Sequence, residues 1–206
     1  MSRRSLKGQA LALAGSLFIF PSCAALFGWD IHAPGLLSQG YFANVQTLQH
    51  RLALYITPGF SSYTSTDRGG RFADPQTYHV GEAYQPMVIE GFQHAFEEFI
   101  YVEAEPDPAI MKQYGIPYLA VVETAEFYNR VTMKGQAVEL VTRIHILNQD
   151  LETVETFEVS GSSDAQKIFS KKGGPEMNLN AALERNITAT VQHIHDSLRT
   201  GAWQEK

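Results

Sequence analysis

Apolar positions recur along the chain with a period that changes from segment to segment, and this period predicts the secondary structure. Alternation with period two indicates strands at 50–57, 135–147 and 152–161. The run at 116–129 is apolar enough for a central strand that is buried on both faces. Residues 148–151 predict the turn of a hairpin between two of these strands.

Two longer segments, 82–99 and 180–201, have apolar residues at helical spacing. Pro86 suits the first turn of the first helix, Asn180 is a plausible cap for the second, and Gly201 is expected to end it. The two apolar stripes comprise Val88, Phe92, Ala95, Phe96 and Phe99 in the first helix and Leu183, Ile187, Val191, Ile194 and Leu198 in the second.

A short strand at 99–106 and a brief helix within 107–115 complete the pattern, with Asp107 as cap, Pro108 at the first helical position and Gly115 beyond the end. The order of elements predicts an α+β domain. We expect a two-layer sandwich with a mostly antiparallel sheet of about four to five strands and two main amphipathic helices on one face. The expected core residues that join the helices to the sheet are Phe92, Phe96, Ile187 and Ile194.

The N-terminal residues have the zones of a secretory signal peptide: Arg3, Arg4 and Lys7 come first, then an apolar run too short to span a bilayer. The segment Phe20-Pro21-Ser22-Cys23 resembles a bacterial lipobox, which implies a diacylglycerol on Cys23, the only cysteine. A plain signal peptide cut nearby, or a buried core cysteine, are the alternatives. The arginine pair also resembles a twin-arginine signal, so the export route stays open between that and the Sec route.

The predicted organisation follows from these segments. Residues 24–47 have no clean period but are too apolar for a free linker, so we expect a tether that packs partly on its own domain or on a partner. The predicted parts are a lipoprotein signal peptide at 1–22, a lipidated tether at 23–47, one α+β domain at 48–201 with a long loop at 59–81, and a tail at 202–206.

Charge restricts the partners. The chain has 16 basic and 22 acidic residues, and losing the three basic residues of 1–22 changes its formal net charge from −6 to −9. This balance argues against nucleic acid, whose phosphates require a basic face. It also argues against electrostatic binding to anionic lipid, so a lipid on Cys23 would have to supply the membrane affinity.

The sequence shows no catalytic constellation, so we expect no enzyme, no cofactor and no metal site. His193 and His195 are two apart on a predicted helix, where they point about 200° apart and cannot hold one ion. His94 and His145 are interpreted as ordinary surface histidines. The carboxylate pairs lie on solvated faces, and no nucleophile elbow, phosphate loop or His-Glu-x-x-His motif is present.

The loop at 59–81 is longer than joining a strand to a helix requires, which favours a role in contacting a partner, although a mobile insertion is an equal alternative. It combines Ser, Thr and Gly with aromatic and arginine residues, types that are enriched at interfaces. The candidate partner-binding residues are Phe60, Tyr63, Arg68, Arg71, Phe72 and Tyr78.

The lipobox, the helix in "YHVGEAYQPMVIEGFQHAFEEF", the strands and the terminal "ALERNITATVQHIHDSL" helix together resemble small bacterial envelope lipoproteins with a domain like the TolB N-terminal domain. This group includes LptE, PelC and CsgG, and the resemblance covers residues 50–200. It implies a non-enzymatic outer-membrane lipoprotein that faces the periplasm and acts as a scaffold or accessory subunit of an export or assembly complex. An envelope protein partner is expected, and a homo-oligomer is compatible with the resemblance.

A different class of function remains open. A periplasmic binding module would hold a small apolar or glycan ligand between sheet and helices, with tyrosine and phenylalanine as its platform. An enclosed cavity lined by aromatic residues would favour this binding module, whereas a flat surface without such a cavity would favour the scaffold.

Overall fold

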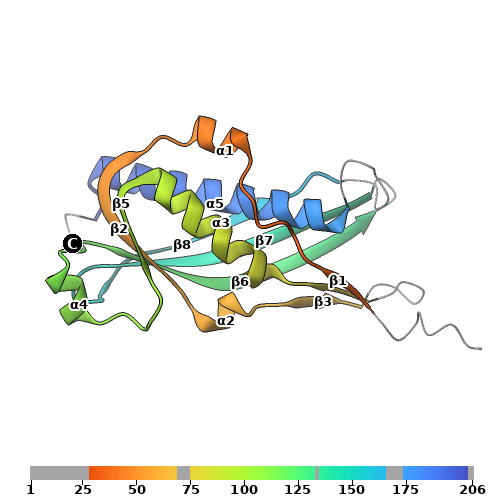
Figure 1. Ribbon diagram of the computed structural model, residues 1–206, viewed down its shortest axis with the longest axis horizontal. Coiled ribbons are helices and arrows are strands. Elements are labelled where there is room, and N and C mark those ends of the chain that lie inside the picture. The colour runs from red at the N-terminus through yellow and green to blue at the C-terminus, as the bar shows by residue number, and fades with distance from the viewer. Residues whose placement is uncertain (1–27, 69–74, 133–134, 166–173, 204–206) are drawn as a thin grey trace, which may run out of the picture.

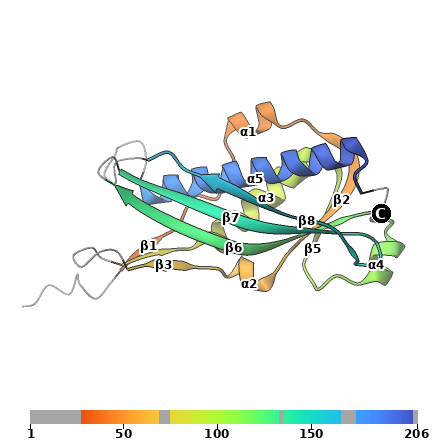
Figure 2. The same ribbon diagram turned by 180° about the vertical axis from the view of Figure 1, so that it is seen from behind.

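The computed structural model describes residues 28–68, 75–132, 135–165 and 174–203. Helix α3 (Val80–Ala95) and helix α5 (Pro175–Thr200) lie on one face of a five-stranded sheet (Figure 1). The same strands are seen from their other side in Figure 2, with these helices behind them. The predicted two-layer α+β sandwich is therefore confirmed.

The large sheet has the strand order β5-β2-β6-β7-β8. Its strands are β5 (Phe96–Val102), β2 (Leu48–Ile56), β6 (Leu119–Thr132), β7 (Gly135–Leu147) and β8 (Thr153–Ser162). The long β6-β7 and β7-β8 ladders are antiparallel, as expected, but β2 pairs in parallel with both β5 and β6. Parallel neighbours need crossover connections, which α3 and the short helix α4 (Pro108–Gln113) provide.

The layer between helices and sheet is filled with side chains. The four residues expected there, Phe92, Phe96, Ile187 and Ile194, are all at most 1% exposed, which confirms this part of the core. Phe96, however, is the first residue of β5 and not the last turn of a helix, because α3 ends at Ala95. The Phe92 and Phe96 rings still meet, with centroids 5.5 Å apart, since the strand turns back under the helix.

The helix starts differ from the expected ones. Helix α3 begins at Val80, so Pro86 lies inside the helix and not in its first turn. Helix α5 begins at Pro175 with Gly174 as cap, and Asn180 is an interior residue. Its amide binds the backbone N–H and C=O of Leu36, at 3.2 and 2.8 Å. The Asn180 side chain, which was expected to cap the helix, instead binds a distant segment of the chain.

Residues 28–47, the expected tether, pack on the domain. They form strand β1 (Trp29–Ile31) and helix α1 (Gln39–Asn44), and α1 lies over the helix layer in Figure 1. Tyr41 is 2% exposed, and its hydroxyl donates to the Gly91 carbonyl oxygen at 3.0 Å. The Ser38 hydroxyl caps α1, and the Ser38 backbone N–H donates to Glu184 at 2.7 Å.

The expected long loop at 59–81 contains regular structure in a large part of its described residues. Helix α2 (Pro58–Ser61) follows β2, and strands β3 (Ser65–Asp67) and β4 (Gln76–Tyr78) form a small sheet in the order β1-β4-β3. Three-residue strands are too short to show a period, and β1 comes from a segment nearly fifty residues away. Periodicity could therefore not predict this sheet.

Helix α5 approaches the sheet closely at Gly161 of β8. A Cβ atom at Gly161 would lie 2.2 Å from the Ala182 carbonyl oxygen and 2.3 Å from the Asn186 backbone nitrogen. The Asn186 side chain is fully buried and donates to the Leu140 and Val159 carbonyl oxygens of β7 and β8, at 3.3 and 3.0 Å. A glycine in the strand thus lets a polar helix residue reach the backbone of two strands.

We predict that Gly161→Ala lowers the free energy of unfolding by about 3 kcal/mol, because the added methyl group pushes α5 away and leaves buried polar groups without partners. Chemical denaturation of the purified chain measures this change. Gly59→Ala is the matched control, since no atom lies within 4 Å of its added Cβ. It should change stability by less than about 0.5 kcal/mol. Equal effects of the two substitutions would contradict the close approach.

Candidate interaction surface

The face of the large sheet opposite α3 and α5 carries polar side chains over the middle of β6, β7 and β8. A second apolar cluster, which includes Ala53, Leu119 and Met111 of α4, covers another part of this face. Alternation along β7 sends Val138, Leu140, Thr142, Ile144 and Ile146 inward, and all five are at most 1% exposed. The residues between them face outward, together with their cross-strand neighbours on β6 and β8. Antiparallel strands of this kind typically have one packed face and one solvated face.

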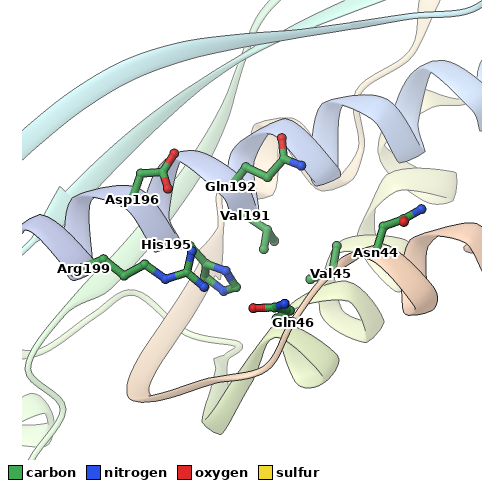
Figure 3. Close-up of a pocket in the computed structure, with 8 residues that line it drawn as sticks. All are labelled: Asn44, Val45, Gln46, Val191, Gln192, His195, Asp196 and Arg199. Atoms are coloured by element: carbon green, nitrogen blue, oxygen red, sulfur yellow. The ribbon is translucent and has the colours of Figure 1, made fainter.

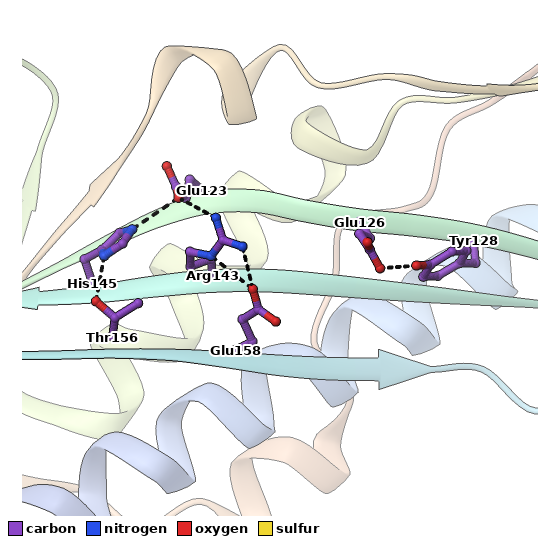
Figure 4. Close-up of polar contacts among 7 residues, drawn as sticks. All are labelled: Glu123, Glu126, Tyr128, Arg143, His145, Thr156 and Glu158. Atoms are coloured by element: carbon purple, nitrogen blue, oxygen red, sulfur yellow. Dashed lines mark hydrogen bonds and ion pairs between the residues drawn. The ribbon is translucent and has the colours of Figure 1, made fainter.

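Arg143 lies at the centre of this open face, between carboxylates of the two neighbouring strands (Figure 4). Its Nε and Nη2 donate to Glu158 Oε1 at 3.0 and 2.7 Å, and its Nη1 is 3.6 Å from Glu123 Oε1. The register explains this, because Arg143 is directly opposite Glu123 on β6 and Glu158 on β8. Opposite charges at such cross-strand positions attract each other.

His145 extends the network along the strand. One ring nitrogen lies 3.1 Å from Glu123 Oε1 and the other 2.9 Å from the Thr156 hydroxyl. Farther along β6, the Tyr128 hydroxyl donates to Glu126. We name the surface formed by Glu123, Glu126, Tyr128, Arg143, His145, Thr156 and Glu158 the open face.

The open face has more acidic than basic groups, because its three glutamates outnumber its one arginine. Hydrogen bonding to Glu158 and the charge of that carboxylate raise the pKa of Arg143 above its ordinary value. The pKa of the Tyr128 hydroxyl is also raised, first by its hydrogen bond to Glu126. Both groups therefore keep their protons at neutral pH. The surface presents donors and acceptors held in place by three strands, an arrangement suited to contacting another surface.

The structure corrects part of the predicted partner-binding set. Phe60 and Tyr78 are 1% and 0% exposed and belong to the chain's own core, where Phe60 packs edge-on against Tyr84 at 4.8 Å. They are therefore not anchors for a partner. Tyr63 is partly buried against Phe60, and Arg68 is exposed. The remaining predicted site residues, Arg71, Phe72 and Cys23, lie outside the described residues.

The histidine predictions have mixed outcomes. His193 and His195 do point to different elements, His193 to Glu155 of β8 at 2.8 Å and His195 to the Ala95 carbonyl oxygen at 3.2 Å. His94 is partly buried instead of being a plain surface residue, and its ring binds the Val45 carbonyl oxygen at 3.0 Å. Periodicity gave no signal for this because the partner lies in the segment expected to be a tether.

A groove of about 380 Å³ runs between the segment after α1 and the C-terminal half of α5. In Figure 3 the side chains of Gln46, His195 and Arg199 come together, whereas Gln192 and Asp196 point away from them. The complete lining is Asn44, Val45, Gln46, Val191, Gln192, His195, Asp196 and Arg199. These eight residues include no serine, threonine or cysteine, so the groove offers donors and acceptors but no hydroxyl or thiol nucleophile.

The described residues after α5 also pack on the core. Trp203, expected in a tail, is 4% exposed and meets Tyr118 with ring centroids 4.9 Å apart. Its indole donates to Glu155 Oε2 at 2.6 Å. Burial alone raises the pKa of Glu155, but hydrogen bonds from His193, Trp203 and Ser197 outweigh burial and bring the pKa below its ordinary value. Glu155 thus stays ionised and joins α5 to β8.

Comparison with known proteins shows no family for this chain. No protein-family model matches it, and no curated protein is similar to it in sequence. Among solved structures, a hypothetical protein from Chlamydia trachomatis is 6% identical with a TM-score of 0.41, covering 73% of this chain and 96% of that chain. Lipoprotein GNA1162 from Neisseria meningitidis is 7% identical with a TM-score of 0.36, covering 71% and 99%. Likenesses this weak support no functional inference.

The helices of the described residues are not membrane spans, since none combines the required length with the required hydrophobicity.

We predict that the chain loses stability below about pH 6.5 through His195. Burial lowers the pKa of this imidazole from 6.5, and the hydrogen bond to Ala95 offsets burial only in part. As pH falls from 6.5 towards the lower folded pKa, the unfolded chain binds a proton that the folded chain does not, so the free energy of unfolding decreases.

His195→Gln keeps a donor for the Ala95 carbonyl oxygen but does not titrate. Its free energy of unfolding, measured by denaturation between pH 7.5 and 5, should therefore vary less with pH than that of the unsubstituted chain. Gln192→Asn, at an exposed position of the same helix that does not titrate, is the matched control and should keep the original pH profile. A His195→Gln profile as steep as the original would show that His195 is not the titrating group.

Proposed function

We propose that this chain is a non-enzymatic bacterial envelope lipoprotein, anchored through Cys23 in the outer membrane and facing the periplasm. In this proposal it acts as a scaffold or accessory subunit of an export or assembly complex and contacts its protein partner through the open face. The observation that carries the proposal is the open face itself. It is an ordered surface of hydrogen-bonded charged and polar side chains with an exposed tyrosine, left uncovered by α3 and α5.

The position of the N-terminal segment supports membrane anchoring. Gly28, the first described residue, follows Cys23 by five residues, a chain length that reaches at most about 18 Å. A lipid on Cys23 would therefore hold the start of β1 close to the bilayer surface. Trp29, next in the chain, is 44% exposed, and tryptophan is a residue type that is favoured at membrane interfaces.

The packing between sheet and helices supports a scaffold over a module that encloses a ligand. Aromatic residues between the layers that could have formed a ligand platform are buried in the core: Phe92 and Tyr84 are both 0% exposed. The Tyr84 hydroxyl donates to Asn186 Oδ1 at 3.1 Å, which leaves this tyrosine with an internal partner. The alternative function, binding a small apolar or glycan ligand between the layers, thus has less support than a surface contact.

The anchoring part of the proposal predicts that the mature chain begins at Cys23 and carries lipid. Intact mass of protein extracted from membranes should equal residues 23–206 plus a diacylglycerol and any further acyl chain. Cys23→Ser should remain unprocessed and unmodified. A mature chain that begins elsewhere, or a Cys23→Ser variant that is processed and stays membrane-bound as before, would contradict lipidation.

The contact part predicts that the open face lies within crosslinking distance of a protein in the native envelope. A photoreactive residue at Glu126, on the open face, should give one defined crosslinked product identified by mass spectrometry. The matched control is Glu90, an exposed glutamate of α3 on the other side of the molecule, which should give none. A product of twice the chain's mass would mean that the open face joins copies of this chain.

Crosslinking at Glu90 but not at Glu126 would place the contact on the helix layer and would contradict the proposed surface. Absence of any product at Glu126, in chains shown to reach the membrane, would contradict the scaffold function itself.

A further inference from the structure

Two histidines and a glutamate meet where β1 and β4 end. His32 Nδ1 lies 3.1 Å from Glu82 Oε2, and His79 Nδ1 lies 3.8 Å from the same oxygen. One ring nitrogen of each histidine and one Glu82 oxygen all lie within 4.8 Å of one another. No spacing in the sequence indicates this group, because the two histidines are 47 positions apart.

The fold explains the meeting. Strands β1 and β4 are parallel neighbours, with Ile31 opposite Tyr78, so the residues that follow them leave the sheet at the same edge. His79 also caps α3, and its backbone N–H donates to the Ile31 carbonyl oxygen at 3.1 Å. Glu82 lies in the first turn of α3 and therefore faces the same point.

We propose that His32, His79 and Glu82 bind a divalent transition-metal ion, with Zn²⁺ as the expected occupant. Two neutral imidazoles and one carboxylate are a ligand set that zinc accepts, and a fourth position would remain open to water or to a group from another molecule. The ligands line a surface cleft of about 140 Å³, so an ion has access from solvent. This inference does not depend on the proposed function.

Asp30 provides an independent observation that favours metal binding. Its carboxylate lies 3.4 Å from Nε2 of His79, the ring nitrogen that faces away from Glu82. A proton on Nε2, donated to Asp30, leaves Nδ1 with a free lone pair directed to the side of Glu82. Metal-binding histidines are commonly held by a carboxylate in this way, which fixes the tautomer and increases the basicity of the ligand atom.

Binding requires a small rearrangement. The two imidazole rings are stacked, with centroids 4.0 Å apart and planes 13° apart, so their lone pairs lie in two nearly parallel planes and do not converge on one point. Tetrahedral zinc holds its ligand atoms about 3.4 Å apart. One ring must therefore rotate while the ligand atoms close in. The His32 and Glu82 side chains are 53% and 68% exposed, so they are free to do so.

An ion at this position would link the N-terminal segment that contains β1 to helix α3. His32 belongs to the segment after β1, whereas His79 and Glu82 belong to the start of α3. The ion would replace the hydrogen bond between His32 and Glu82 with stronger coordination. We therefore expect metal to stabilise the docking of residues 28–35 on the domain.

The test uses the full chain, stripped of metal by a chelator and titrated with ZnCl₂ in a calorimeter. One equivalent should bind, and Co²⁺ at the site should give the visible absorption of a coordinated ion. His32→Ala and His79→Ala should each weaken the affinity at least about tenfold, and Asp30→Asn should lower the affinity without changing the stoichiometry. Zn²⁺ should also slow proteolysis within residues 28–35 in the unsubstituted chain and not in His32→Ala.

His145→Ala is the control for general histidine binding, because His145 also contacts a glutamate but has no second histidine beside it. This variant should keep the original affinity and stoichiometry. His32→Ala removes a largely exposed side chain, so circular dichroism and the melting temperature without metal should match those of the original chain. Zn²⁺ binding that is absent in the original chain, or unchanged in both His32→Ala and His79→Ala, would overturn the proposal.

Discussion

The contact between α5 and the β7-β8 ladder is the constraint on which the rest of the structure depends. Gly161 removes the side chain that would separate helix from sheet, and Asn186 then places both amide hydrogens on strand carbonyl groups. The Asn186 oxygen accepts hydrogen bonds from Tyr84 and Thr142, so helix α3 is tied to the same point. A buried amide whose donors and acceptor are all used specifies one arrangement of the two layers, because any shift would leave polar groups unpaired.

The N-terminal segment depends on this helix pair. Tyr41 reaches the Gly91 carbonyl oxygen on α3, Ser38 binds Glu184 on α5, and Asn180 holds Leu36. With both helices in place, β1 can pair with β4 and bring its end against the start of α3. The proposed metal site is a consequence of this order, since its ligands come from the segment and from the helix on which the segment docks.

The proposed contact surface arises from the opposite side of the same sheet. Helices α3 and α5 cover one face and leave the middle of the β6-β7-β8 ladder on the other face to polar residues, and the register places Arg143 between two glutamates. Isolated surface ion pairs contribute little to stability. The ion pairs of the open face hold the charged side chains in place. Side chains that are already held lose less conformational entropy when another surface binds them.

Local pattern determined much of the fold. Period-two alternation defined β7 at residues 135–147, and Asp107, Pro108 and Gly115 bounded α4 as expected, because each signal acts within a few residues. The sequence likewise identified Phe92 and Ile194 as core. Only the tertiary structure decided the parallel pairing of β2, the small β1-β4-β3 sheet, the burial of Phe60 and Tyr78, and the meeting of His32 with His79. These features join segments far apart in the chain, and such contacts depend on how the layers pack, which no local period records.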